Sequence, residues 1–301
     1  MFCETRGSAR PERIACFSNL ATLFSRMTRE SLSRFDRDTA CVRRFGSTYD
    51  VSIDGGWWIV RGPNGGYIAA LLANAIRDAV GDRERPLRSL TVHYLRPPSE
   101  GPATVETKIE RSGRTVTTVT ARLEQNGKLQ ALATAAHAVP RDRGGFEHMR
   151  MPEVAPPEQC PCRSLGDPNS IPMHDRYEQR TAIGPESRSA PRTREAVTGG
   201  WIRLTEPRPW DPTLIAAIAD AWPPAVFATH EMPEAGGGVP TVDLTSHIIA
   251  PDAIAALAAS DFVLVRFETR IVRGGYLEED GDIWSPTGQL LARARQIGVV
   301  L

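Results

Sequence analysis

The chain repeats itself, and this internal repeat restricts its fold more than any other feature of the sequence. Three short segments recur in the same order, and the intervals between them differ by only a few residues. The matching pairs are residues 68–71 with 215–218, 90–93 with 244–247, and 127–133 with 288–294. Each match is weak alone, but three matches in one order predict two copies of one domain.

The first copy predicts one buried helix followed by an antiparallel sheet. Pro63 and the glycines Gly65 and Gly66 are typical of a helix start, and residues 67–76 are apolar nearly all round. Strands are expected at residues 57–60, 89–95, 103–109, 115–124 and 128–138, with a hairpin turn at Asn126-Gly127. The expected fold class is α+β, with a sheet long enough to curl round the helix.

The second copy predicts the same plan. Asp211 is a typical N-cap and Pro212 a typical first helical residue, so an apolar helix is expected over residues 213–222. Further strands are expected at residues 176–182, 196–204 and 288–298.

The last of these strands carries a polar residue on its apolar face. Side chains alternate along a strand, so Leu290, Ala292, Ala294 and Gln296 share one face, while Leu291 and the arginines share the other. The first face is apolar and is expected to point inward. A buried amide costs free energy unless it is hydrogen-bonded, so Gln296 must belong to a polar network or serve a site.

Polar residues replace alanines when the two copies are compared. Gln296 stands where the first copy has Ala135, and Asp220 stands where it has Ala73. Asp220 is also the only charged residue between Pro212 and residue 229. An ionised carboxylate in such apolar surroundings must be hydrogen-bonded or have a raised pKa.

Composition argues against a charged partner. The 301 residues include 41% hydrophobic residues, and Lys+Arg and Asp+Glu balance at 36 each. No overall field favours nucleic acid, a membrane surface or a polyanion, so a small and mostly apolar partner is expected.

The chain is expected to divide into four parts. Residues 1–40 are rich in Arg and Ser and predict a disordered lead, or a start codon assigned upstream of the functional one. Residues 41–140 form the first domain, the Pro-rich residues 141–175 a linker or surface excursion, and residues 176–301 the second domain.

The cysteines favour a reducing cytoplasm. There are five, irregularly spaced, and we find no signal peptide or long apolar span. Cys160-Pro-Cys162 could be half of a metal site, but neither a second pair nor a spaced His accompanies it. No metal is expected.

From about Phe45 to the C-terminus, apart from the linker, the chain resembles the TesB-like acyl-CoA thioesterases, which are proteins of two fused hotdog domains. The residues that carry this resemblance are 62–67, 94–97, Gly113-Arg114, 241–251 and 286–298. The resemblance implies that the two sheets join, that an acyl-CoA is the substrate, and that homo-oligomers are possible, with no fixed number of chains. No cofactor is expected.

The resemblance also implies a catalytic set. An Asp on the second helix, a Thr on the following strand and a Gln on the last strand activate a water in that family, and by motif these fall on Asp220, Thr241 and Gln296. The chain departs from the family in the residue after Gln296, in the strand after Thr241 and in the linker. Hydrolysis of a thioester by this water would need no covalent intermediate, and a helix N-terminus could polarise the carbonyl.

Gly65, Gly66 and Tyr67 are the candidate substrate-binding residues. The two glycines could approach a CoA phosphate or could only allow close helix packing. His93 and His247 occupy equivalent positions in the repeat, which favours a structural role for both. The alternatives are a catalytically silent acyl-CoA or lipid-binding protein, and a double-hotdog hydratase, for which no Asp and His motif is present.

Overall fold

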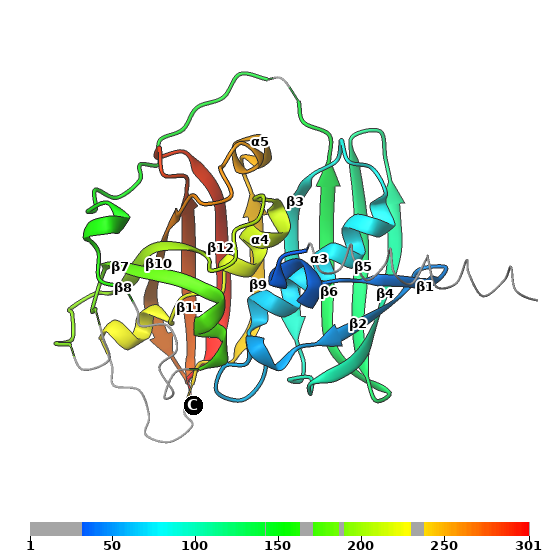
Figure 1. Ribbon diagram of the computed structural model, residues 1–301, viewed down its shortest axis with the longest axis horizontal. Helices are drawn as coiled ribbons and strands as arrows, with labels where there is room; N and C mark the ends of the chain where they lie inside the picture. The colour runs from blue at the N-terminus through cyan, green and yellow to red at the C-terminus, as the bar shows by residue number, and fades with distance from the viewer. Residues whose placement is uncertain (1–31, 142, 163–170, 187–189, 230–237, 301) are drawn as a thin grey trace, which may run out of the picture.

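The computed structural model describes residues 32–141, 143–162, 171–186, 190–229 and 238–300, and these build one antiparallel sheet of twelve strands (Figure 1). The strand order across the sheet is β1-β2-β4-β5-β6-β3-β9-β12-β11-β10-β8-β7. The first half of the sheet comprises β1 (Val42–Phe45), β2 (Thr48–Ile53), β3 (Leu87–Tyr94), β4 (Gly101–Ser112), β5 (Val116–Gln125) and β6 (Lys128–Ala138). The second half comprises β7 (Tyr177–Ile183), β8 (Ala196–Leu204), β9 (Thr241–Ile248), β10 (Val263–Arg273), β11 (Tyr276–Trp284) and β12 (Leu290–Val299).

The two halves meet where β3 pairs with β9. Thr91 lies opposite Thr245, and their hydroxyl oxygens are 2.9 Å apart. These two threonines are the same position of the repeat, so an approximate two-fold axis passes between them. The sequence register that aligned residues 90–93 with 244–247 is therefore confirmed.

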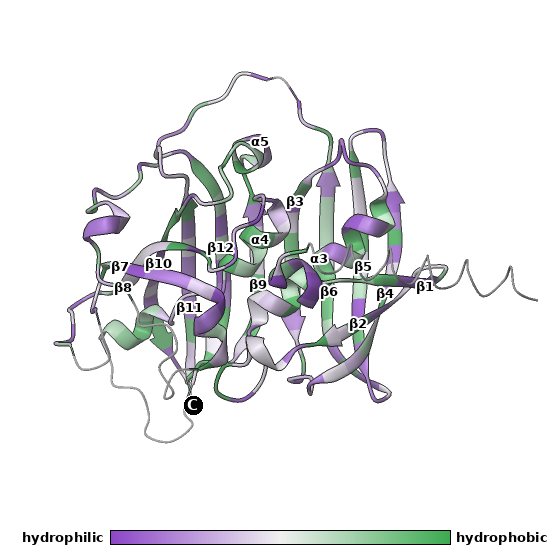
Figure 2. Ribbon diagram, viewed as in Figure 1, coloured by the Kyte–Doolittle hydropathy of each residue, from purple (hydrophilic) through white to green (hydrophobic). Residues whose placement is uncertain are grey.

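Two central helices cover one face of the sheet. In Figure 1, α3 (Gly65–Val80) and α4 (Pro212–Ile218) lie side by side near its centre, and they pack on each other. Their N-caps are equivalent in the repeat: Asn64 Oδ1 accepts from the N–H of Tyr67 at 3.1 Å, and Asp211 Oδ1 from the N–H of Leu214 at 2.8 Å. The inner side chains of the strands and the apolar residues of both helices form the main core. Figure 2 shows the resulting alternation of hydrophobic and hydrophilic residues along the strands.

Short helices complete the described part of the chain. They are α2 (Arg34–Asp38) and α5 (Pro251–Ala255), with 3₁₀ turns η1 (Gly55–Trp57), η2 (Pro157–Gln159), η3 (Pro172–Arg176) and η4 (Ala225–Ala228). No helix among the described residues is long and apolar enough to cross a bilayer.

The helix α4 is shorter than expected. It ends at Ile218, whereas the apolar pattern predicted helix to residue 222. Pro223 and Pro224 follow, and a residue that precedes proline is pushed away from helical geometry. Asp220 therefore lies in the turn after the helix, where its N–H donates to Ala217 O at 3.3 Å.

The strand expected at residues 57–60 is wrong. These residues begin with the end of η1, which Asp54 caps by accepting from the N–H of Gly56 at 2.8 Å. The Trp57 ring is fully buried and stacks on Tyr67, with centroids 5.2 Å apart. Burial of this aromatic pair in the core outweighs the strand propensity of the segment.

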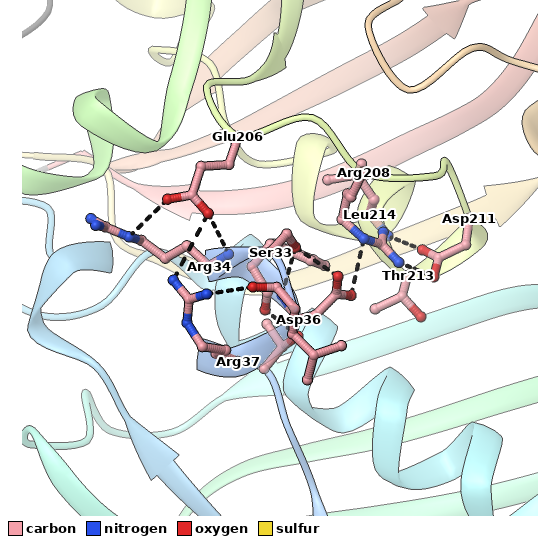
Figure 3. A network of polar contacts seen from close by, with 12 residues as sticks. Ser33, Arg34, Asp36, Arg37, Glu206, Arg208, Asp211, Thr213 and Leu214 are labelled. Carbon is pink, nitrogen blue, oxygen red and sulfur yellow. Dashed lines mark hydrogen bonds and ion pairs between the residues drawn. The ribbon is translucent and has the colours of Figure 1, made fainter. Parts of the chain in front are cut away.

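Part of the expected N-terminal lead is folded. Residues 1–31 lie outside the described residues, but α2 buries Phe35 to 2% exposure and packs it edge-on against Trp57. Ion pairs join α2 to the start of α4: Arg208 lies 3.0 Å from Asp36 and 2.9 Å from Asp211 (Figure 3). The prediction of disorder is therefore wrong for residues 32–40.

The strand β12 contains a bulge that reverses one expected orientation. Ile283 pairs with Ala292, but the next residue, Trp284, pairs with Leu290. As a result Leu291 enters the main core and Leu290 joins a second apolar cluster. Ala292, Ala294 and Gln296 are buried on the inner face, as their alternation predicted.

Residues 143–162, which we call the strap, cover part of the opposite face of the sheet. The connection after β6 arches across to the second half (Figure 1). Met149, Met151 and Val154 pack there on a second cluster, and the Trp201 indole donates to Ala155 O at 2.9 Å. This second cluster consists of Cys160, Trp201, Leu264, Trp284 and Leu290. The strap thus seals tryptophans that would otherwise face water.

Cys160 belongs to this apolar contact. Its thiol donates to Ala155 O at 3.4 Å, and burial raises the pKa of the thiol. In the described part of the chain there is no group of three or more His, Cys, Asp or Glu side chains that could hold a metal ion.

Candidate active site

A chain of hydrogen bonds links three strands of the second half. Thr241, the first residue of β9, donates its hydroxyl to Gln296 Oε1 at 2.9 Å. Gln296 Nε2 donates in turn to Glu279 Oε1 on β11 at 2.7 Å. The structure thus brings two of the predicted catalytic residues into direct contact and adds Glu279, which we did not predict.

Glu279 is a buried acid held by neutral donors. It is 2% exposed, and its Oε2 accepts from the N–H of Ala225 at 2.6 Å and from the Thr269 hydroxyl at 3.4 Å. Burial raises the pKa of Glu279 to about 7, and the charge of Asp220 contributes to this rise. These donors from η4 and β10, together with Gln296, satisfy the carboxylate oxygens without a cation.

Asp220 is held by the N-terminus of the other central helix. Its Oδ2 accepts from the N–H of Gly66 at 3.0 Å and from Asn64 Nδ2 at 2.9 Å, while Asn64 Nδ2 also donates to Asp220 O at 2.7 Å. Burial raises the pKa of Asp220 to about 6, although the N–H groups of Gly66 and Gly65 and the Asn64 amide act in the opposite direction. Asp220 is therefore poised to exchange a proton near neutral pH.

The two glycines permit this close approach. A Cβ at Gly65 would lie 2.8 Å from Asp220 Oδ2 and 3.1 Å from Tyr94 Cζ, and a Cβ at Gly66 would overlap Ala217 O. Tyr94 encloses the same corner, because its hydroxyl donates to Gly65 O at 2.8 Å. Of the two interpretations of Gly65 and Gly66, close packing of the helices has direct geometric support.

Asp220 stands apart from the other two predicted residues. Among the described residues, no hydrogen bond joins it to Thr241 or Gln296. Its connection to them is electrostatic, through the effect of its charge on Glu279. The structure therefore presents a carboxylate and a polar chain that interact through charge, with no hydrogen bond between them.

Tyr67 does not belong to the site. It is fully buried, and its hydroxyl donates to the backbone oxygens of Asp38 and Ser52 and accepts from the N–H of Asp54. The assignment of Tyr67 to substrate binding is therefore corrected to a core role. His93 and His247 are exposed on the other face of the sheet, where His93 pairs with Asp243 across the central strands.

Two residues of the site were missed. Asn64 lies beside the predicted glycines, and a residue that caps α3 while also holding Asp220 can be recognised only in three dimensions. Glu279 lies in an acidic run, residues 278–280, that reads as a solvated strand. Its cross-strand pairing with Gln296 is the signal that reveals it.

Sequence profiles of one family match both halves of the chain. The profile of the acyl-CoA thioesterase N-terminal domain matches residues 54–139, and that of the C-terminal domain matches residues 155–300. A search of curated protein sequences found no match.

Solved structures share the same architecture. A conserved protein of unknown function with a hot dog fold from Alicyclobacillus acidocaldarius is 26% identical, with a TM-score of 0.81, over 90% of this chain and 98% of that one. A protein from Thermobifida fusca, provisionally assigned as a thioesterase II, is 27% identical, with a TM-score of 0.75, over 90% and 98%. Acyl-CoA thioesterase II TesB2 from Mycobacterium marinum has the same fold at 19% identity and a TM-score of 0.69, over 89% and 98%.

The fold and the profiles define a double hotdog protein of the α+β class. The chain belongs to the acyl-CoA thioesterase family. The expected fold class and the family resemblance are both confirmed.

Proposed function

We propose that this chain hydrolyses acyl-CoA thioesters to a free fatty acid and CoA. One observation carries the proposal: Asp220, Thr241 and Gln296 are polar, whereas the first copy has Ala73, Leu87 and Ala135 at the equivalent positions. The sheet and helices of the first half are built with the apolar residues, so the fold alone does not require the polar set. A role in chemistry explains why one half carries it.

The direction of the hydrogen bonds suits the activation of water. Because the Thr241 hydroxyl donates to Gln296, its oxygen lone pairs are left to accept from another group. A water that donates one hydrogen to Thr241 and the other to Asp220 would aim a lone pair at the thioester carbonyl carbon. Gln296 holds Thr241 in the orientation that this arrangement needs.

The reaction then proceeds without a covalent enzyme intermediate. The water oxygen bonds to the carbonyl carbon while Asp220 takes one water proton. The carbon–sulfur bond breaks next, and the proton on Asp220 passes to the departing CoA sulfur. A pKa of about 6 lets Asp220 serve first as base and then as acid.

Two donors can stabilise the developing oxyanion. The N-terminus of α3 has the right polarity, but the N–H of Gly66 donates to Asp220 in this structure, so a substrate would have to share it. The Gln296 amide carries two hydrogens, and Glu279 accepts one of them. The other is left for a substrate or the water.

The test is the release of free CoA thiol from acyl-CoAs of increasing chain length. Wild-type protein should release thiol, and Asp220→Asn should reduce kcat by about 10²–10⁴-fold, because the general base is lost. Below about pH 6, wild-type kcat/KM should fall about tenfold for each pH unit, because Asp220 must be ionised to accept a proton.

Asp252→Asn is the matched control, since Asp252 is an exposed carboxylate on α5 and should leave the rate unchanged. If no acyl-CoA releases thiol while acyl-CoA still raises the Tm, the chain is a silent binding protein and the proposal fails. A rate that Asp220→Asn leaves unchanged would remove Asp220 from the mechanism.

A further inference from the structure

We propose that Glu279 is a positioning residue that fixes the orientation of the Gln296 amide and, through it, the orientation of the Thr241 hydroxyl. The inference rests on the proposed hydrolysis and deepens it. Glu279 does not touch the water or the substrate in this scheme. It acts only through Gln296.

The contacts form a chain with one direction. Gln296 Nε2 donates to Glu279, so Gln296 Oε1 must face the other way, and there it accepts from Thr241. The distances are 2.7 Å at the Glu279 end and 2.9 Å at the Thr241 end. Both contacts lie within the range of well-formed hydrogen bonds.

A carboxylate at this position selects one of the two amide orientations. An ionised carboxylate only accepts hydrogen bonds, so rotating the amide by half a turn would bring Gln296 Oε1 against Glu279 and lose the bond. In the rotated state Nε2 would face Thr241, whose hydroxyl hydrogen would then point toward the water. Thr241 would then donate to that water instead of accepting from it, and the geometry needed for attack would be lost.

The surroundings fix the carboxylate itself. The N–H of Ala225 and the hydroxyl of Thr269 both reach Glu279 Oε2, which leaves Oε1 for Gln296. In the described part of the chain, Glu279 takes part in no ion pair. The Glu279 carboxyl group is thus held by hydrogen bonds of defined direction.

The other half of the molecule argues against a purely structural role. Leu90 pairs with Ala135, and Leu244 pairs with Gln296, so Ala135 and Gln296 are equivalent in the sheet. Ala135 pairs on its other side with Val119, and Gln296 with Glu279. The first half therefore folds with a Val and Ala pair where the second has Glu and Gln.

The kinetic test compares two amide substitutions on neighbouring residues of β11. Glu279→Gln keeps the size of the side chain, but the N–H of Ala225 needs its amide oxygen as acceptor, so its NH2 group faces Gln296 and favours the reversed orientation of the Gln296 amide. We expect kcat to fall about 10- to 100-fold, with KM within about twofold of wild type. Asp280→Asn is the control: this buried carboxylate pairs with Arg295 on the opposite face, and its loss should leave kcat unchanged.

A spectroscopic test separates this inference from the proposed function. The side-chain amide signals of Gln296, assigned by their absence in Gln296→Ala, should shift in wild-type protein as Glu279 ionises between about pH 5 and 9. In Glu279→Gln that pH response should disappear. This readout needs no substrate and no turnover.

The outcomes are distinct. If wild-type protein hydrolyses acyl-CoA and Glu279→Gln is equally fast, the role of Glu279 is overturned and the function stands. If no thioester is hydrolysed but the Gln296 signals follow pH, the function fails while the positioning contact is supported. Signals that ignore pH in the wild type would overturn the contact itself.

Discussion

The two halves of the molecule have the same plan and opposite chemistry at equivalent positions. The first half has only apolar residues where the second has Asp220, Thr241, Glu279 and Gln296; these are Ala73, Leu87, Val119 and Ala135. Both halves wrap a sheet round a central helix. The comparison teaches that the apolar set is sufficient for folding, so the polar set is the part to test for function.

The starts of the two helices differ in the same way. At α3, Gly65 and Gly66 leave room for a carboxylate from the opposite half. At α4, Thr213 donates to Asn74 Oδ1 at 3.3 Å, and Arg208 pairs both with the N-cap Asp211 and with Asp36 of α2 (Figure 3). One helix start is a candidate site, and the other is closed by a structural network.

The largest expected effect comes from converting Gln296 to the residue of the first half. Gln296→Ala should reduce kcat by about 10²–10³-fold, because Thr241 loses its acceptor and the site loses an amide donor. The measurement is thiol release at saturating acyl-CoA. Gln125→Ala is the matched control: this buried amide bonds the backbone of Ser99 in the first half, and its removal should lower the Tm but not kcat. Equal rates for the two variants would contradict the comparison.

Replacing both Glu279 and Gln296 by the residues of the first half should separate stability from function. The double variant Glu279→Val and Gln296→Ala copies Val119 and Ala135, and it should raise the free energy of unfolding by about 1–4 kcal/mol, because a buried charge is replaced by apolar packing. Urea unfolding monitored by fluorescence measures this change. The double variant should be inactive.

The gain in unfolding free energy of the double variant should increase with pH. Burial raises the pKa of Glu279 from 4.5 to about 7, so the folded state holds the proton over a range in which the unfolded state has lost it. The stability that protonated Glu279 contributes to the wild type is fully present at low pH, and it is lost as pH rises from about 4.5 to 7. The advantage of the double variant should grow over the same range. A double variant less stable than wild type at pH 8 would show that the polar pair is needed for folding.

Asp280→Asn should instead cost stability at neutral pH, since Arg295 lowers the pKa of Asp280.

The smallest expected effect concerns the closed helix start. Arg208→Gln removes ion pairs to Asp36 and Asp211, and it should cost about 2 kcal/mol of unfolding free energy. The rate of hydrolysis should not change, because this network lies at α4. The exposed pair of Arg44 and Asp50 provides the control, and Arg44→Gln should change stability by less than about 0.5 kcal/mol. A loss of activity in Arg208→Gln would mean that the two helix starts are coupled.

Much of the fold was predictable because the repeat and the alternation of side chains report on burial. The repeat identified the equivalence of Ala135 and Gln296, and residue types identified the N-cap Asp211 and the turn at Asn126-Gly127, where both residues have positive φ. Each of these depends on local backbone geometry or on a repeated register.

The remainder depended on contacts between distant segments. The position of Asp220 follows from the early end of α4, which lets its carboxylate reach α3. Glu279 looks like any acid on a solvated strand until β11 is paired with β12. Phe35 and Trp57 take their conformations from the core that they share with Tyr67, and no local pattern encodes that core.

The contact between Thr91 and Thr245 at the centre of the sheet has a consequence for how this molecule can vary. If two identical chains met at that contact, every substitution would appear twice, once on each side of the axis. A carboxylate suited to one helix start would then also be imposed on the other. Joining both sides in one chain removes this obligation, so one substitution changes one side only. A symmetric pair of identical chains could not have Val at one of two equivalent positions and Glu at the other, as this chain has at Val119 and Glu279.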